Sequence, residues 1–67
     1  MQEISFNQVK DLAVNGVAYW SMVYDLDKQN AQVVKCEHDD KVCVIHYQVW
    51  NSFYRTWLDR EERLAIG

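Results

Sequence analysis

The residues best suited to chemistry are two cysteines and two histidines near the middle of the chain: Cys36, His38, Cys43 and His46. Two thiolates and two imidazoles form a ligand set that tetrahedral zinc accepts. Their spacing lacks the closely spaced cysteine pair that is usual in structural zinc sites. We therefore expect no metal site and interpret Cys36 and Cys43 as small, buried, free thiols in a reducing compartment. Zinc binding and a cross-strand disulfide are the alternatives.

A histidine stands beside two carboxylates in His38-Asp39-Asp40, which suggests acid–base chemistry or a hard cation. Aspartate is also favoured in tight turns, because its side chain bonds local backbone amides, and we interpret the segment as a turn. Asp25-Leu26-Asp27 begins like a calcium loop but lacks the later glycine and glutamate. Nucleophile motifs, phosphate-binding loops and dinucleotide fingerprints are absent from the sequence. We expect no catalytic residues, no cofactor and no enzymatic activity.

The chain is rich in aromatic residues, with three Trp, four Tyr and two Phe among 67 residues. The core of so small a domain rarely supplies more than ~3–5 kcal/mol, and we expect it to leave some of these rings outside. Trp, Tyr and Arg are enriched at interface hot spots. The residues predicted to bind a partner are Tyr19, Trp50, Tyr54, Arg55 and Trp57. The sequence favours a small non-enzymatic protein–protein interaction module that acts as a homodimer with a partner of unknown identity.

A nucleic-acid-binding accessory protein is the alternative function. Arg55, Arg60 and Arg63 lie close together near Tyr54 and Trp57, and aromatic rings mixed with arginine stack on single-stranded bases. Three carboxylates stand among these arginines: Asp59, Glu61 and Glu62. They cancel most of the positive field, so we expect protein to be the partner rather than nucleic acid.

The overall charge points the same way, because ten acidic and seven basic residues give a formal net charge of −3. An acidic chain has no general attraction for a phosphate backbone. The first six residues lack the basic start and apolar stretch of a signal peptide, and no apolar run approaches the ~20 residues that span a bilayer. We expect a cytoplasmic protein without a membrane segment.

These residues are positioned by a single small domain, residues 1–67. Ser5 and Gln8 have the spacing of a capping box, which predicts a helix over 6–14. Asn15-Gly16 is expected to end it; the alternative reads this pair as a hairpin turn between strands. Runs rich in β-branched and aromatic residues predict strands over 17–26, 32–37 and 42–47.

The last third of the chain, 49–66, has apolar residues at helical spacing, including Trp50, Phe53, Tyr54 and Trp57. We expect an amphipathic helix there. The fold class is therefore α+β in the order α-β-β-β-α, with a three-stranded antiparallel meander and both helices packed on one face.

A turn at Asp39-Asp40 would place Cys36 opposite Cys43 and Val34 opposite Ile45. Tyr19 and Val33 would then lie on the second face of the sheet. A register shifted by one residue, which would separate the cysteines, stays open.

Overall fold

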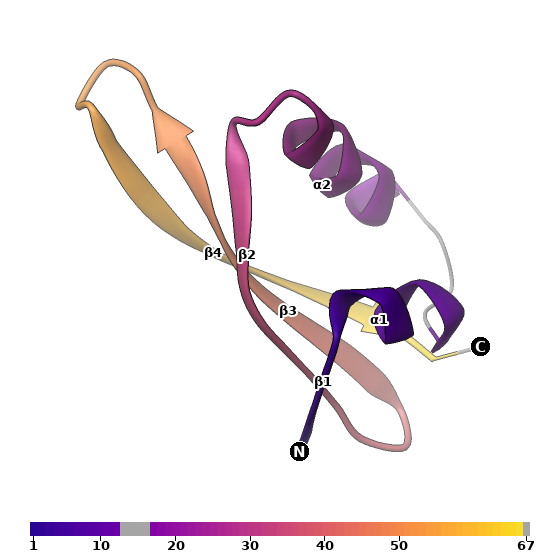
Figure 1. The fold of residues 1–67 in the computed structure, drawn as a ribbon. Coiled ribbons are helices and arrows are strands. Elements are labelled where there is room, and N and C mark those ends of the chain that lie inside the picture. Colours follow the sequence, from indigo (N-terminus) through magenta and orange to yellow (C-terminus); the bar gives the residue numbers. More distant parts are fainter. Residues whose placement is uncertain (13–16, 67) are drawn as a thin grey trace.

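The protein folds as two helices packed against one four-stranded antiparallel sheet (Figure 1). This computed structural model describes residues 1–12 and 17–66. In chain order the elements are β1 (Gln2–Ile4), α1 (Phe6–Leu12), α2 (Val17–Asp27), β2 (Ala31–His38), β3 (Val42–Asn51) and β4 (Thr56–Ala65). The strands are ordered β1-β2-β3-β4 across the sheet. The α+β class and the antiparallel sheet are confirmed, whereas the three-stranded sheet and the element order α-β-β-β-α are wrong.

The predicted first helix is confirmed over Phe6–Leu12, and the capping box forms as expected. The backbone N–H of Ser5 donates to Oε1 of Gln8 at 2.9 Å, and the N–H of Gln8 donates to the Ser5 hydroxyl at 3.2 Å. Residues 13–16, which include the predicted helix end and turn, lie outside the described residues. Because the segments on both sides are helices, the alternative of a hairpin between two strands is wrong.

The predicted strand over 17–26 is wrong, because this segment is helix α2. Tyr19, Met22, Val23 and Leu26 all contribute to the core, and their spacing of three and four residues is that of one helical face. A short run that is apolar at nearly every position fits both periods, so alternation alone could not identify the element. The helix ends at Asp27, and Gln29, two residues later, has a left-handed φ of 61°.

The predicted C-terminal helix over 49–66 is also wrong. This segment forms the end of β3, a four-residue connection and β4. Trp50 lies opposite Trp57 and Asn51 opposite Thr56, so the aromatic spacing reflects a cross-strand pair rather than a helical face. β4 continues to pair with β3 as far as Ala65, opposite Val42.

The pairing of β2 with β3 differs by two residues from the predicted register. Cys36 lies opposite Ile45, and His38 lies opposite Cys43. Since the difference is an even number of residues, both cysteines still lie on the face expected of them. An irregularity in the pairing between Val33 and Lys35 reverses the predicted faces of Val33 and Val34. Val33 packs against the core, and Val34 is 59% exposed.

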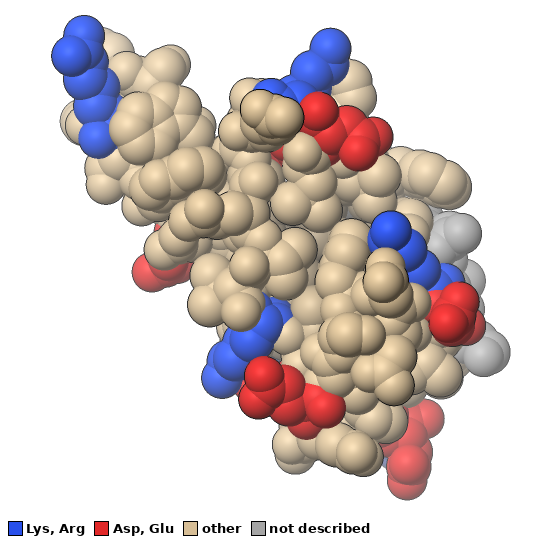
Figure 2. Space-filling view, in the orientation of Figure 1, with Lys and Arg blue, Asp and Glu red and all other residues tan. Residues whose placement is uncertain are grey.

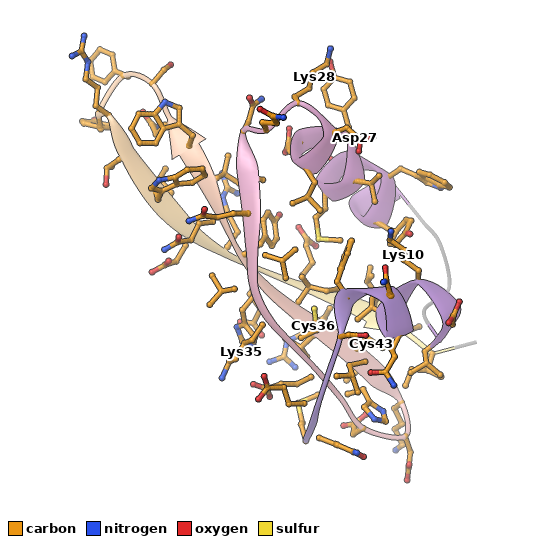
Figure 3. All side chains as sticks on the ribbon, viewed as in Figure 1. Lys10, Asp27, Lys28, Lys35, Cys36 and Cys43 are labelled. Carbon is orange, nitrogen blue, oxygen red and sulfur yellow. The ribbon has the colours of Figure 1, made fainter. Side chains whose placement is uncertain are left out.

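The core lies between the helices and one face of the sheet. α1 contributes Val9, α2 contributes Tyr19 and Met22, and the strands contribute a larger set: Ala31, Cys36, Cys43, Ile45, Tyr47 and Leu64. Figure 3 shows Cys36 and Cys43 on the helix side of the sheet and Lys35 on the other side. Within the described chain no helix covers that other face, which carries a hydrogen-bonded row of Gln32, Gln48 and Asp59.

Candidate protein-binding hairpin end

The β3–β4 hairpin extends past the rest of the sheet and ends in an exposed arm (Figure 1). β2 begins at Ala31, opposite Val49, and the backbone N–H of Trp50 still donates to the carbonyl oxygen of Asn30 at 2.6 Å. Beyond Trp50 the two strands of the hairpin pair only with each other. We call residues Trp50–Leu58 the hairpin end. It projects on the side away from α1, at the far end of the sheet from the two helix-covered cysteines.

The local sequence closes this hairpin without glycine or proline. Oδ1 of Asn51 accepts the backbone N–H of Tyr54 at 2.9 Å, which is the short-range bond that asparagine favours in turns. Arg55 takes the left-handed conformation, with φ of 53°, and returns the chain to β4. The hairpin therefore has a defined shape at its end.

Two aromatic pairs fix the orientation of the side chains on this arm. The rings of Trp50 and Trp57 meet edge to face across the strands, with centroids 5.4 Å apart. Phe53 and Tyr54 form a second edge-to-face pair with centroids 4.9 Å apart. Such pairs contribute about 0.5–1.5 kcal/mol beyond their buried area. The aromatic surface is therefore held in place by its own contacts.

Every large apolar side chain of the hairpin end is exposed. The exposed fractions are 41% for Trp50, 85% for Phe53, 71% for Tyr54, 37% for Trp57 and 38% for Leu58. A surface this apolar on so small a chain is a feature of interaction sites rather than of an ordinary solvent-facing surface.

The hairpin end also differs in charge from the rest of the chain. Arg55 is its one charged residue, although the whole chain has a net charge of −3. Figure 2 shows this arm covered by uncharged side chains with basic atoms at its tip. The acidic residues of β4 begin only at Asp59.

Four of the five predicted partner-binding residues come together here: Trp50, Tyr54, Arg55 and Trp57. The fifth, Tyr19, lies elsewhere and is only 6% exposed, because it faces the core from α2 instead of the second sheet face. Sequence reasoning missed Phe53 and Leu58 as surface residues, since both fitted the buried side of the predicted helix. The polar pair Asn51-Ser52, directly after the apolar run that ends at Trp50, is the sequence signal for a turn at this place.

The cysteines and histidines do not form a common site. Cys36 and Cys43 are free thiols buried in the core, and desolvation raises the pKa of both. His46 lies on the uncovered face, with Nε2 3.6 Å from Oε1 of Glu37. Among residues 1–12 and 17–66, no three His, Cys, Asp or Glu side chains are grouped as metal ligands.

Asp39 closes the β2–β3 turn, as its residue type predicted. Its Oδ1 accepts the backbone N–H groups of Lys41 and Val42, each at 2.8 Å. These two bonds favour the ionised carboxylate and lower its pKa. The geometry assigns Asp39 a structural role in the turn.

The described part of the chain contains no pocket. Neither of its helices is long and apolar enough to cross a membrane. The chain matches no protein-family model, no curated protein and no solved structure.

Proposed function

We propose that this chain is a small non-enzymatic protein–protein interaction module that acts as a homodimer and binds a second protein through the hairpin end. The observation that carries the proposal is the projecting arm with five exposed large apolar side chains in nine residues, Trp50–Leu58. The free thiols of Cys36 and Cys43 support a reducing compartment, for which we propose the cytoplasm.

The composition of the hairpin end supports binding by a few strong anchors. Trp, Tyr and Arg are the residue types most enriched at hot spots, where truncation costs about 2 kcal/mol or more. Their entropy cost on binding is low here, because the two aromatic pairs already restrict the rings. A rigid, narrow, apolar arm suits insertion into a groove better than contact with a flat surface.

The charge of the hairpin end indicates which charge to expect at the edge of the partner's groove. Arg55 stands at the tip without a carboxylate among residues 50–58. We expect a partner groove that is apolar inside and acidic at the edge, because an arginine at the rim then gains a complementary charge.

Nucleic acid is a weaker candidate partner than protein. Arg55, Arg60 and Arg63 were expected close together on one helix. Arg60 and Arg63 lie instead in strand β4, in which successive residues face opposite sides of the sheet. Arg60 and Arg63 therefore lie on different faces. Glu61 lies on the face of Arg63 and contacts it, with 3.1 Å between Oε1 and Nη2.

A quantitative pull-down with matched surface variants tests the proposal. The double variant Phe53→Ser/Tyr54→Ser removes the two most exposed rings of the hairpin end, and neither ring contributes to the core. Trp20→Ser/Tyr24→Ser is the control, because it removes two rings that are 58% and 60% exposed on α2. We expect the hairpin variant to lose the protein that the wild type captures and the control to retain it.

The proposal is overturned if both double variants capture the same protein as the wild type. Capture that disappears after nuclease treatment, together with salt-sensitive binding of the wild type to a single-stranded oligonucleotide, would assign the arm to nucleic acid instead. Circular dichroism of each variant confirms that the comparison is made between folded proteins.

A further inference from the structure

β4 is a long strand at the edge of the sheet. It has ten residues, and β3 is its only strand neighbour in the described chain. Residues Thr56–Glu61, Arg63 and Ala65 are exposed. An edge strand directs alternate backbone N–H and C=O groups outward, where another strand can pair with them.

The charges along β4 are complementary to those of β4 itself when a second copy runs antiparallel. Centring the pair on Glu61 puts Asp59 opposite Arg63 of the second copy, and Arg60 opposite Glu62 of the second copy. Two-fold symmetry repeats both pairs, so four ion pairs form. Leu58 then lies opposite Leu64 of the second copy.

We propose that the chain dimerises by pairing β4 with β4 of a second copy, antiparallel and centred on Glu61, so that the two sheets become one. The inference rests on the homodimer of the proposed function and specifies its interface. Charges on an edge strand usually prevent pairing, and here their order permits one register.

Symmetry and charge together exclude the neighbouring registers. A two-fold axis normal to the sheet keeps each side chain on its own face, so one residue must lie opposite its own copy. Centring on Arg60 would oppose Asp59 to Glu61 and the two copies of Arg60 to each other. Centring on Glu62 would leave only the Glu61–Arg63 pairs. The register centred on Glu61 therefore has the most complementary pairs.

The two faces of β4 support this register in different ways. On the uncovered face Arg63 already contacts Glu61 of its own chain, which reduces the repulsion between the two copies of Glu61 at the centre. On the helix side Glu62 is oriented by Tyr47, whose hydroxyl donates to Oε1 at 3.3 Å. The position of Glu62 for pairing with Arg60 is therefore partly set before association.

Pairing would also cover apolar surface that one chain leaves open. Leu58 is 38% exposed, whereas Leu64 is 6% exposed beneath the helices. In the dimer the uncovered half of each β4 lies beside the helix-covered half of the other. Leu58, which lies opposite Val49 in its own chain, gains a second apolar neighbour.

A cysteine cross-link reads the register directly. Glu61→Cys places two thiols at directly opposed positions, where Cβ atoms are about 4.5–5.5 Å apart. Ala65→Cys is the matched control on the same strand and face, because its two copies would be eight residues apart, roughly 26 Å, and Ala65 belongs to none of the four ion pairs. Cys36 and Cys43 are buried, and oxidation of the wild type measures any cross-linking through them. We expect mild oxidation to link two chains of Glu61→Cys and to leave Ala65→Cys at the wild-type level.

Charge exchange gives a second, independent readout by sedimentation equilibrium. We expect Asp59→Arg or Arg63→Asp alone to weaken the dimer at least about fivefold, and the double variant to restore it, because each pair contributes modestly but occurs twice. Glu61→Gln should tighten the dimer by up to about fivefold, since it removes the one like-charge pair.

The outcomes separate this inference from the proposed function. The β4 interface is overturned, while a homodimer stays in place, if the dimer persists in both single variants, Asp59→Arg and Arg63→Asp, and does not cross-link through position 61. A wild type that is monomeric at every concentration overturns both the interface and the homodimer. Capture of a partner by the hairpin end is measured separately and is unaffected by either result.

Discussion

Two residues other than glycine hold left-handed backbone conformations in the described chain, Gln29 with φ of 61° and Arg55 with φ of 53°. Gln29 follows the end of α2, and Arg55 directly precedes the start of β4. At Gln29 the backbone N–H groups of residues 29 and 30 donate to the carbonyl oxygens of Leu26 and Asp25, the bonds of a Schellman motif. The left-handed conformation costs a side-chain-bearing residue roughly 1–2 kcal/mol.

Replacing Gln29 with glycine should therefore stabilise the protein. We expect Gln29→Gly to raise the free energy of unfolding by about 1 kcal/mol, because glycine adopts this φ without a steric cost. Urea denaturation measures the change. Lys28→Gly is the control: Lys28 is the neighbour of Gln29 within the motif and its φ is not positive, so glycine there should lower stability. A loss of stability in Gln29→Gly would contradict the assignment of strain to this residue.

Asp39 should give the stability of the fold a specific acid dependence. Its folded-state pKa is lowered from 3.8, first by the N–H of Lys41 and then by that of Val42. A carboxyl with a lowered pKa contributes stability that is fully present above its unfolded pKa and is lost as pH falls through the folded pKa.

Asp39→Asn tests that dependence, since an amide oxygen still accepts both bonds but does not titrate. We expect the wild type to be the more stable protein near neutral pH and this advantage to shrink at pH values below 3.8. Urea midpoints of both proteins across this range provide the measurement. An advantage independent of pH would show that ionisation of Asp39 does not contribute.

At the scale of the element, the hairpin end depends on a cross-strand pair instead of the core. Trp57 is 37% exposed and contacts Trp50, so we expect Trp57→Ala to cost about 1–2 kcal/mol, mainly the lost ring pair and partial burial. Met22→Ala is the comparison, because Met22 is 1% exposed and removing such a side chain costs about 2–5 kcal/mol. Thermal denaturation should show a folded Trp57→Ala protein and a far less stable Met22→Ala protein; the reverse order would place Trp57 in the core.

The elements that could be predicted from the sequence are those with local signals. Ser5 and Gln8 determine where α1 begins, and Asp39 determines the turn between β2 and β3. The two wrong elements, 17–26 and 49–66, lack such signals. The chain turns after α2 at Gln29 and between β3 and β4 at Arg55, and both turns use left-handed residues that are not glycine. The glycine that usually marks such turns is therefore missing from the sequence at both places.

The candidate site was more predictable than the element that carries it. Trp50, Tyr54, Arg55 and Trp57 were expected at a surface because the aromatic content exceeds what a small core holds. That argument depends on composition and is independent of secondary structure. Composition alone could not show that Tyr19 is buried while the other four residues are exposed. Its burial follows from the helical face that it shares with Met22 and Leu26.

At the scale of the whole molecule, the projecting arm makes the protein elongated, with extents of 38 × 21 × 15 Å. The two helices cover part of one sheet face, and no helix of the described residues covers the hairpin end or the β4 edge (Figure 1). These two surfaces have different chemistry: one is apolar and aromatic, and the other carries charges of both signs. We infer that the edge joins two copies and that the arm contacts another protein.

Site-specific photo-cross-linking in cells tests most directly whether the hairpin end binds that protein. Phe53 is replaced by the photoreactive amino acid benzoylphenylalanine, and Trp20 on α2 is replaced in the same way as the matched exposed control. We predict a discrete cross-link between position 53 and one other protein that does not form from position 20. The absence of any product from position 53, or the same products from both positions, would contradict the account, as would a product containing only two copies of this chain.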